Sequence, residues 1–288
     1  MANSASNTVS MIKLSTNTVV KTVTVGRYPI GVAITHNGSY AYVTNGGSNT
    51  VSVIKTSTGT VVKTVRVGHE PVWVAIAPNG SYAYVTNLKS GTVSVIHTST
   101  NAVVKTVAAG RSSLGVAITP NGSGAYVANA SSGTVSVIET YANTVVKTVG
   151  VGIGPYGVAI TPNGSDAYVT NTYRPGTVSV ITTSTNAVVK TLGVGHDPEG
   201  IAIDPDGSHA YVANAGSGTV SVIATSSNAV AKTVRVGSNP VGVAITHNGR
   251  YVYVTNGMSN TVSVIETSSD TVVKTVTVGK HPGGVDIT

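Results

Sequence analysis

The chain has 288 residues, of which 9% are charged and 41% are hydrophobic, and it contains no cysteine. The lack of cysteine excludes disulfides and thiolate metal sites, and no apolar run is long enough to span a membrane. The net charge of +7 reflects one repeated lysine position, because the other ten basic residues equal the ten acidic ones in number. We therefore expect no nucleic-acid partner.

A repeated segment, Thr-Val-Ser-Val-Ile, sets the organisation of the chain. Its copies lie 42 residues apart, with one interval of 43. Such a period, with two-residue alternation of Val, Thr, Ile and Tyr, predicts propeller blades and excludes helical repeats. A β-solenoid would repeat over far fewer residues. The copies start at Thr50, Thr92, Thr134, Thr177, Thr219 and Thr261, with a variant at Thr8.

Four strands are predicted in each unit, named A to D from the channel outward. One set of copies, in chain order, is D at 18–25, A at 30–35, B at 40–45 and C at 50–54. The Asn37-Gly38 pair between A and B predicts a hairpin turn, because both residue types tolerate positive φ. We predict an all-β fold, a seven-bladed β-propeller of four-stranded antiparallel blades with 42-residue repeats, as one domain over residues 1–288.

The two chain ends are predicted to share the last blade. Residues 283–288 repeat strand A, and Met1-Ala2-Asn3 repeats the end of strand B. The chain is seven residues shorter than seven complete units, and the missing residues are the A–B turn and the start of this strand B. The expected monomer would therefore carry unpaired backbone groups that another chain or segment could fill. The gap also suggests a domain cut from a longer repeat protein.

The strand B signature is specific. It reads Tyr42-Val43-Thr44-Asn45, recurs at Tyr84, Tyr168 and Tyr253, and becomes Tyr-Val-Ala-Asn at Tyr126 and Tyr211. With its flanking segments it closely resembles the YVTN family of β-propeller repeats over essentially the whole chain. That resemblance implies a surface-layer or cell-surface protein used in scaffolding or adhesion, extracellular in its parent protein. The Met-Ala-Asn-Ser start carries no export signal. Related propellers include lactonases and lyases, so an enzymatic function is kept as the alternative.

Residues present in every copy are expected to serve the blade, and residues that differ are candidates for function. The seven strand D lysines are interpreted as edge protection, with a polyanion-binding belt as the alternative. The D–A and B–C loops meet at one end of the channel and vary most, as a binding mouth does. The candidate ligand-binding residues are Arg27, Tyr28, His69, Glu70, Trp73, Arg111, Tyr156, Tyr173, Arg174, His196, Asp197, Glu199, Lys280, His281 and Asp286.

Two function classes remain. The first is a non-catalytic interaction or scaffold propeller that binds a protein or glycan on the D–A/B–C loop face. The second is a small-molecule hydrolase or lyase with a divalent metal or a His/carboxylate site at the channel mouth. His69, His196 and His281 could hold such a metal, but no local ligand spacing supports it, and solvated loop histidines are the alternative. No P-loop, dinucleotide fingerprint or nucleophile elbow occurs.

Overall fold

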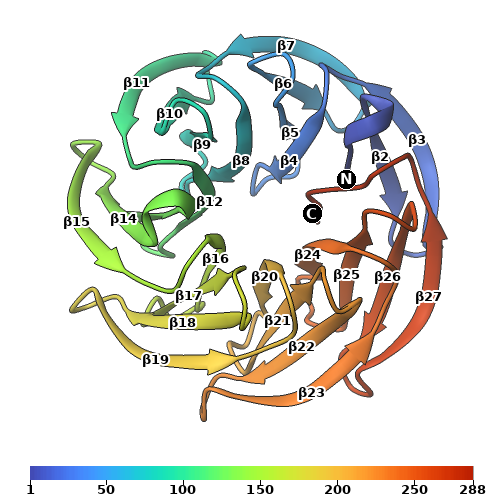
Figure 1. Ribbon diagram of the computed structural model, residues 1–288. Coiled ribbons are helices and arrows are strands. Elements are labelled where there is room, and N and C mark those ends of the chain that lie inside the picture. The colour runs from blue at the N-terminus through green and yellow to red at the C-terminus, as the bar shows by residue number, and fades with distance from the viewer. Residues whose placement is uncertain (288) are drawn as a thin grey trace.

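The computed structural model describes residues 1–287 as a ring of blades around a central channel (Figure 1). Six four-stranded antiparallel sheets and one three-stranded sheet make up the ring, which confirms the predicted seven-bladed β-propeller. Two single-turn 3₁₀ helices, Ser4–Ser6 and Ala130–Ser132, lie in B–C loops. None of the helices within residues 1–287 has the length and apolarity needed to cross a membrane.

Strand A lines the channel in each complete blade, and strand B follows it. The A strands are β4 (Pro29–Ile34), β8 (Pro71–Ile76), β12 (Ser113–Ile118), β16 (Pro155–Ile160), β20 (Pro198–Ile203) and β24 (Pro240–Ile245). The complete B strands are β5 (Tyr40–Asn45), β9 (Tyr82–Asn87), β13 (Gly124–Asn129), β17 (Asp166–Asn171), β21 (His209–Asn214) and β25 (Tyr251–Asn256).

Strands C and D complete each blade toward the outside. The C strands are β2 (Thr8–Lys13), β6 (Thr50–Lys55), β10 (Thr92–His97), β14 (Thr134–Glu139), β18 (Thr177–Thr182), β22 (Thr219–Ala224) and β26 (Thr261–Glu266). The D strands are β3 (Thr18–Thr24), β7 (Thr60–Arg66), β11 (Ala102–Ala108), β15 (Thr144–Gly150), β19 (Ala187–Gly193), β23 (Ala229–Arg235) and β27 (Thr271–Thr277).

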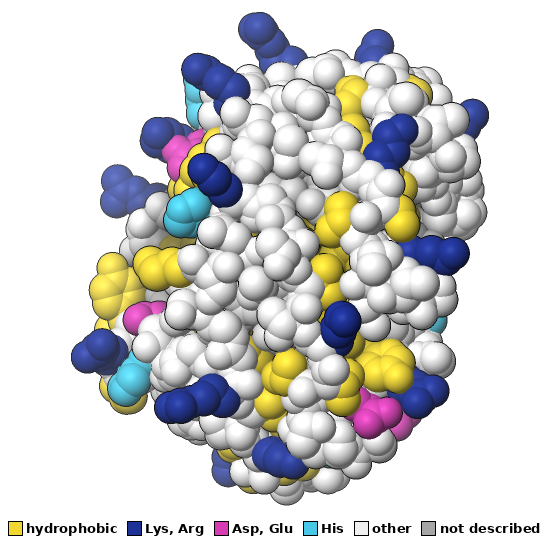
Figure 2. Space-filling model, turned by 90° about the vertical axis from the view of Figure 1, so that its right-hand side faces the viewer, with side chains coloured by type: hydrophobic (Ala, Val, Ile, Leu, Met, Phe, Trp, Pro, Cys, Tyr) yellow, Lys and Arg dark blue, Asp and Glu magenta, His cyan; other side chains and the backbone are white. Residues whose placement is uncertain are grey.

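Burial follows the distance of a strand from the ring surface. Strands B and C are buried on both faces, because each blade packs against a blade on either side. Strand D is exposed except for one position, such as Val65 of β7. Its lysine, such as Lys63, is exposed in every blade, as edge protection requires. In Figure 2 the basic side chains on one side of the ring stand apart and form no continuous patch.

The strand B motif joins each blade to the next one, which confirms that its tyrosines serve blade packing. The Tyr42 hydroxyl donates to Asn101 Oδ1 in the C–D turn of the following blade, at 2.7 Å. The Thr44 hydroxyl donates to the Val72 carbonyl at 2.7 Å, also in that blade. The same tyrosine bond closes the ring, because Tyr253 donates to Asn17 Oδ1 at 2.5 Å. Burial raises the pKa of Tyr42 to about 12, so its hydroxyl stays a donor at neutral pH.

The A–B turns differ in detail from the simple two-residue hairpin that Asn-Gly predicts. Gly38 has a φ of +69°, whereas Asn37 is not among the residues with positive φ. Asn37 acts through its side chain, whose Oδ1 accepts from the Thr35 hydroxyl at 2.8 Å and the Ser39 amide at 3.0 Å. The asparagine is thus fixed by an Asx turn.

The closing blade, defined as β1 (Ala2–Asn3), β2, β3 and residues 283–287, is assembled from both chain ends, as predicted. Ala2 N donates to the Gly284 carbonyl at 3.0 Å, and Gly283 N donates to the Ala2 carbonyl at 2.9 Å. The expectation of a seventh strand A over 283–288 is wrong for residues 283–287, which are not in a strand, and only the preceding Pro282 forms an isolated bridge, with Asn3. The strand B residues that would pair with them are missing. Thr288 lies outside the described residues.

Candidate functional site

The D–A and B–C loops emerge together at one end of the channel, as the strand order predicts. Within one blade they are tied by hydrogen bonds: Gly46 N donates to the Tyr28 carbonyl at 2.9 Å, and Arg27 N donates to Ser48 Oγ at 2.7 Å. The second D–A residue has positive φ in every blade, so the variable side chains stand on one repeated backbone. These residues are Tyr28, Glu70, Ser112, Gly154, Asp197, Asn239 and His281.

The three loop histidines stay apart. His69, His196 and His281 are exposed and belong to three different blades. His69 Nδ1 lies 3.5 Å from Asn49 Nδ2, and the neighbouring Glu70 pairs with Lys89 at 2.8 Å. Across residues 1–287 no group of three His, Asp or Glu side chains could hold a metal ion. The structure therefore does not bring the three histidines into one site.

Three of the predicted residues do meet inside the channel. Trp73 from β8 and Tyr156 from β16 lie edge to face, with ring centroids 6.4 Å apart and planes at 79°. Glu199 from β20 lies close enough to Tyr156 for the two side chains to shift each other's pKa. Tyr28 is close enough to Tyr156 to influence its charge. Residues 73, 156 and 199 all lie in the first half of strand A, which places them just inside the mouth.

The channel changes the acid–base behaviour of this group. Removal from water raises the pKa of Glu199 to about 7, and Asp197 adds to the increase, whereas the neighbouring Tyr156 hydroxyl opposes it. Burial and the neighbouring Glu199 raise the pKa of the Tyr156 hydroxyl far above its ordinary value. Glu199 is thus divided between its neutral and charged forms near neutral pH, which suits a general acid or base.

A cavity of about 580 Å³ occupies the channel below Trp73. It extends toward the A–B turns, where His36 and His247 lie, so it opens away from the predicted mouth. Asp286 is on its wall, and its carboxylate accepts from Ile34 N at 2.7 Å and Ile287 N at 2.9 Å. Burial raises the pKa of Asp286, while these bonds lower it. Asp286 is therefore separate from the loop face where the sequence pattern placed it.

The blade formed by β16–β19 carries the most distinctive part of the loop face. Ile153 is 71% exposed and Tyr173 is 66% exposed, and the Tyr173 amide donates to the Ile153 carbonyl at 3.3 Å. A Cβ on Gly154 would lie 2.5 Å from the Tyr173 ring, so any larger residue there would displace that ring. Arg174 beside them is exposed and precedes a cis proline. Sequence reasoning identified Tyr173 and Arg174 but missed Ile153, whose signal was its place in a variable loop.

The remaining candidates stand on the loop rim. Arg27, Arg111 and Lys280 are exposed, and each comes from a different D–A loop. Glu70 is the only candidate in an ion pair within the described chain, so the free basic groups make the rim positive.

Comparisons with known proteins agree on the architecture. A family described as "Lactonase, 7-bladed beta-propeller" matches residues 167–286, less than half of the chain. Kuenenia stuttgartiensis hydrazine synthase is similar in structure, with a TM-score of 0.82 and 22% identity over 90% of this chain and 89% of that chain. A functionally unknown protein from Desulfotomaculum acetoxidans DSM 771 has a TM-score of 0.86 and 20% identity over 98% and 96%. No curated protein matches. At these identities the structural likeness shows the fold alone.

Proposed function

We propose that this propeller is a non-catalytic scaffold of the cell-surface type that binds a protein partner on its D–A/B–C loop face. The observation that carries the proposal is the exposed apolar pair Ile153 and Tyr173 beside Arg174. Large apolar and aromatic side chains next to arginine are typical of the residues that dominate protein interfaces. A glycan stacked on Tyr173 is the alternative ligand of the same surface.

The charge of the rim favours an acidic partner. Arg27, Arg111, Arg174 and Lys280 are exposed there, and Lys89 neutralises Glu70 at 2.8 Å. Guanidinium groups bind carboxylates through two parallel hydrogen bonds, so arginine also gives such a surface directional specificity. The resemblance of the strand B motif to YVTN repeats supports this role, and we propose with it an extracellular location for the parent protein.

The test compares affinity capture by three forms of the protein, with captured proteins identified by mass spectrometry. The double variant Ile153→Ser/Tyr173→Ser removes the apolar pair, and Tyr141→Ser is the matched control. Tyr141 is 96% exposed in a C–D turn at the other end of the ring. We expect a partner retained by the wild type and Tyr141→Ser but lost by the double variant. Identical captured sets for all three forms would contradict the proposal.

A glycan array run with the same three proteins separates the two ligand classes. Glycan binding that the double variant loses and Tyr141→Ser keeps would assign the loop face to carbohydrate. Thermal denaturation of chelator-treated protein with Zn²⁺, Mn²⁺, Ca²⁺ or Mg²⁺ added tests the predicted metal. A bound ion at about 100 times its dissociation constant adds about 2.7 kcal/mol of stability, and His69→Ala should abolish that gain.

A lactone hydrolase is the second candidate, favoured by the lactonase match and by Glu199. In such a reaction Glu199 would take a proton from water as the water oxygen bonds to the lactone carbonyl carbon. The ring C–O bond would break, and the ring oxygen would accept that proton. Trp73 and Tyr156 would hold the lactone ring by apolar contact inside the channel.

Hydrolysis of a panel of small lactones, followed by proton release, tests this candidate. Because the base must be ionised, the rate should rise with pH and level off above about 7. Glu199→Gln should lose about 100-fold or more in rate while unfolding at a temperature near that of the wild type. Rates no higher than those in buffer across the panel would exclude the activity.

A further inference from the structure

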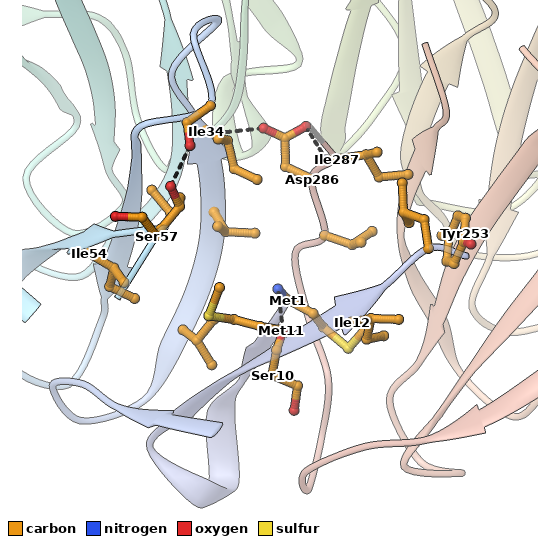
Figure 3. Close-up of a pocket in the computed structure, with 17 residues that line it drawn as sticks. Met1, Ser10, Met11, Ile12, Ile34, Ile54, Ser57, Tyr253, Asp286 and Ile287 are labelled. Carbon is orange, nitrogen blue, oxygen red and sulfur yellow. Dashed lines mark hydrogen bonds between the residues drawn. The ribbon is translucent and has the colours of Figure 1, made fainter. Parts of the chain in front are cut away.

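A hollow of about 360 Å³ lies in the closing blade, at the end of the ring opposite the loop face (Figure 3). Its wall is mostly apolar, and its polar groups include the Asp286 carboxylate and the Met1 amine, which bonds to Ser10. It is formed by the closing blade, the next blade β4–β7 and Tyr253 of the blade before it. None of these features belongs to the proposed loop-face function.

A complete blade shows what normally occupies this position. The ring of Tyr42 is 1% exposed and shares one hydrophobic cluster with Val53 of its own blade. The same cluster includes Ile76, Ala83 and Ile96 of the following blade. Each of the six tyrosines of the motif is buried in this way, with at most 2% exposure.

The hollow is lined by the repeat equivalents of those neighbours. One repeat earlier in the chain, Val53 corresponds to Met11, Ile76 to Ile34, Ala83 to Ala41 and Ile96 to Ile54. All four equivalents line the hollow. The tyrosine itself would come directly before Met1, within the seven residues by which the chain is shorter than seven complete units. The space is therefore a tyrosine socket with its walls in place.

The backbone next to the socket is also unpaired. In the complete blade, Tyr42 pairs with Val53, Ala41 with Ile54 and Tyr40 with Lys55. In the closing blade, β1 pairs with β2 at Ala2–Val9 and Asn3–Thr8, and the Met1 and Ser10 backbones exchange hydrogen bonds beside them. Residues 11–13 of β2 have no strand B partner within the described chain, so they form a free edge on the side of the hollow. An edge beside an apolar socket is the arrangement used in β-strand addition.

We propose that the hollow accepts an extended segment of another polypeptide that ends in Ala-Tyr. The tyrosine fills the socket opposite Met11, and the alanine packs on Tyr253. Met1, the repeat equivalent of Val43, lines the hollow next to the tyrosine position, so the tyrosine is the last residue that the hollow admits. A second copy of this chain does not supply such a segment, because its own Ala-Tyr segments are buried in their blades, as with Ala83-Tyr84.

One position shows that the socket is not a full copy of the others. In five of the complete blades the tyrosine hydroxyl donates to an asparagine of the next C–D turn, as Tyr84 does to Asn143 at 2.9 Å. The equivalent turn residue at the hollow is Gly59, with a φ of +57°. Asparagine fits this backbone, because Asn101 has a φ of +53° in the matching turn. A Cβ on Gly59 would meet only the flexible ends of the Lys21 and Met11 side chains.

The experiment measures binding of the synthetic peptide His-Asn-Gly-Ser-Tyr-Ala-Tyr, the sequence of residues 36–42, by isothermal titration calorimetry. We expect one peptide per chain, and at least about tenfold weaker binding when the last tyrosine is replaced by alanine. Gly59→Asn should tighten binding of the tyrosine peptide by about 2- to 10-fold, through one added hydrogen bond. It should leave the affinity for a peptide ending in phenylalanine unchanged.

A covalent control places the binding at the hollow. The same seven residues joined ahead of Met1 fill the socket from within the chain, so this form should no longer bind the free peptide. Absence of binding to the unfused protein at about 1 mM peptide, well above the weakest useful affinity, would overturn the proposal. Equal affinity for the tyrosine and alanine peptides, or unchanged binding by the fused form, would also overturn it.

Discussion

The closing blade and the complete blade β4–β7 have the same repeat, but only the complete blade buries a tyrosine in strand B. Tyr42 is 1% exposed and bonds to the next blade at 2.7 Å. In the closing blade the equivalent space is a hollow of about 360 Å³. The difference shows that the ring stays closed with one socket empty, because β1 and the C-terminal segment already exchange backbone hydrogen bonds. Each blade contributes to a nearest-neighbour sum, so one incomplete interface is tolerated.

The largest effect is expected from emptying a second socket. Tyr84→Ala removes a fully buried ring and its bond to Asn143, which should lower the free energy of unfolding by about 3–5 kcal/mol. Denaturant unfolding followed by fluorescence of the single tryptophan measures it. Tyr141→Ala, at a 96% exposed position, should change stability by less than about 0.5 kcal/mol. A loss below about 1 kcal/mol for Tyr84→Ala would contradict the packing role of the motif.

A pH effect should distinguish the closing blade from the others. Burial lowers the pKa of the Met1 amine to about 6, with Asp286 opposing the shift. Between pH 6 and 8 this amine binds more protons in the unfolded chain than in the folded one, so its contribution to stability should rise with pH. The rise should be roughly 2–3 kcal/mol and should be lost as the pH falls through this window. The difference in the free energy of unfolding between the unmodified and the N-acetylated protein, measured at each pH, isolates the contribution of the amine. Identical pH profiles for the two forms would contradict the buried amine.

Adding the missing strand B residues to the closing blade should make its packing and backbone pairing more like those of the other six blades. With His-Asn-Gly-Ser-Tyr-Ala-Tyr joined ahead of Met1, the hollow is filled and residues 11–13 of β2 gain backbone partners. We expect about 2 kcal/mol of added stability, seen as a higher melting temperature. The same extension with alanine for its last tyrosine is the matched control and should gain less. An unchanged melting temperature for both extensions would show that the missing residues do not lower the stability of the fold.

The smallest effect concerns the threonine of the motif. Thr44→Val leaves Gly31 N and the Val72 carbonyl without their side-chain partner, and we expect a loss of about 1–2 kcal/mol. Ala128 occupies the equivalent position in its blade, so Ala128→Thr should gain up to about 1 kcal/mol. Thermal unfolding of the pair measures both. If both substitutions shift stability in the same direction, the inter-blade bond is not the cause.

Strand order, ring size and closure could be read from the repeat, because the period of two and the turn residues act locally. The seven-residue gap likewise located the incomplete blade. Two details could not be read. Strand A of the closing blade lacks its pairing because its partner residues are missing, and Asn37 acts through its side chain while only Gly38 takes positive φ. Both details depend on which backbone and side-chain groups contact one another in the folded chain.

The candidate site was predictable only as a set of variable loop positions. Trp73, Tyr156 and Glu199 were identified one by one, but their convergence within the channel depends on side-chain directions in three separate blades. His69 and His196 share the first D–A loop position and His281 takes the second, yet the seven-fold arrangement holds all three on the exposed rim. Side chains at the same position of different repeats lie in different blades. The symmetry of the ring therefore keeps them apart and does not bring them into one site.

The sequence by itself determined the blade, its number of copies and the place of the missing residues, since these follow from local periodicity and turn chemistry. Only the tertiary structure decided which side chains share a space. It raised the pKa of Glu199 to about 7 by placing it in the channel. It also set Met11, Ile34, Ala41 and Ile54 around an empty socket. Burial and proximity arise from packing between blades, and no single repeat contains that information.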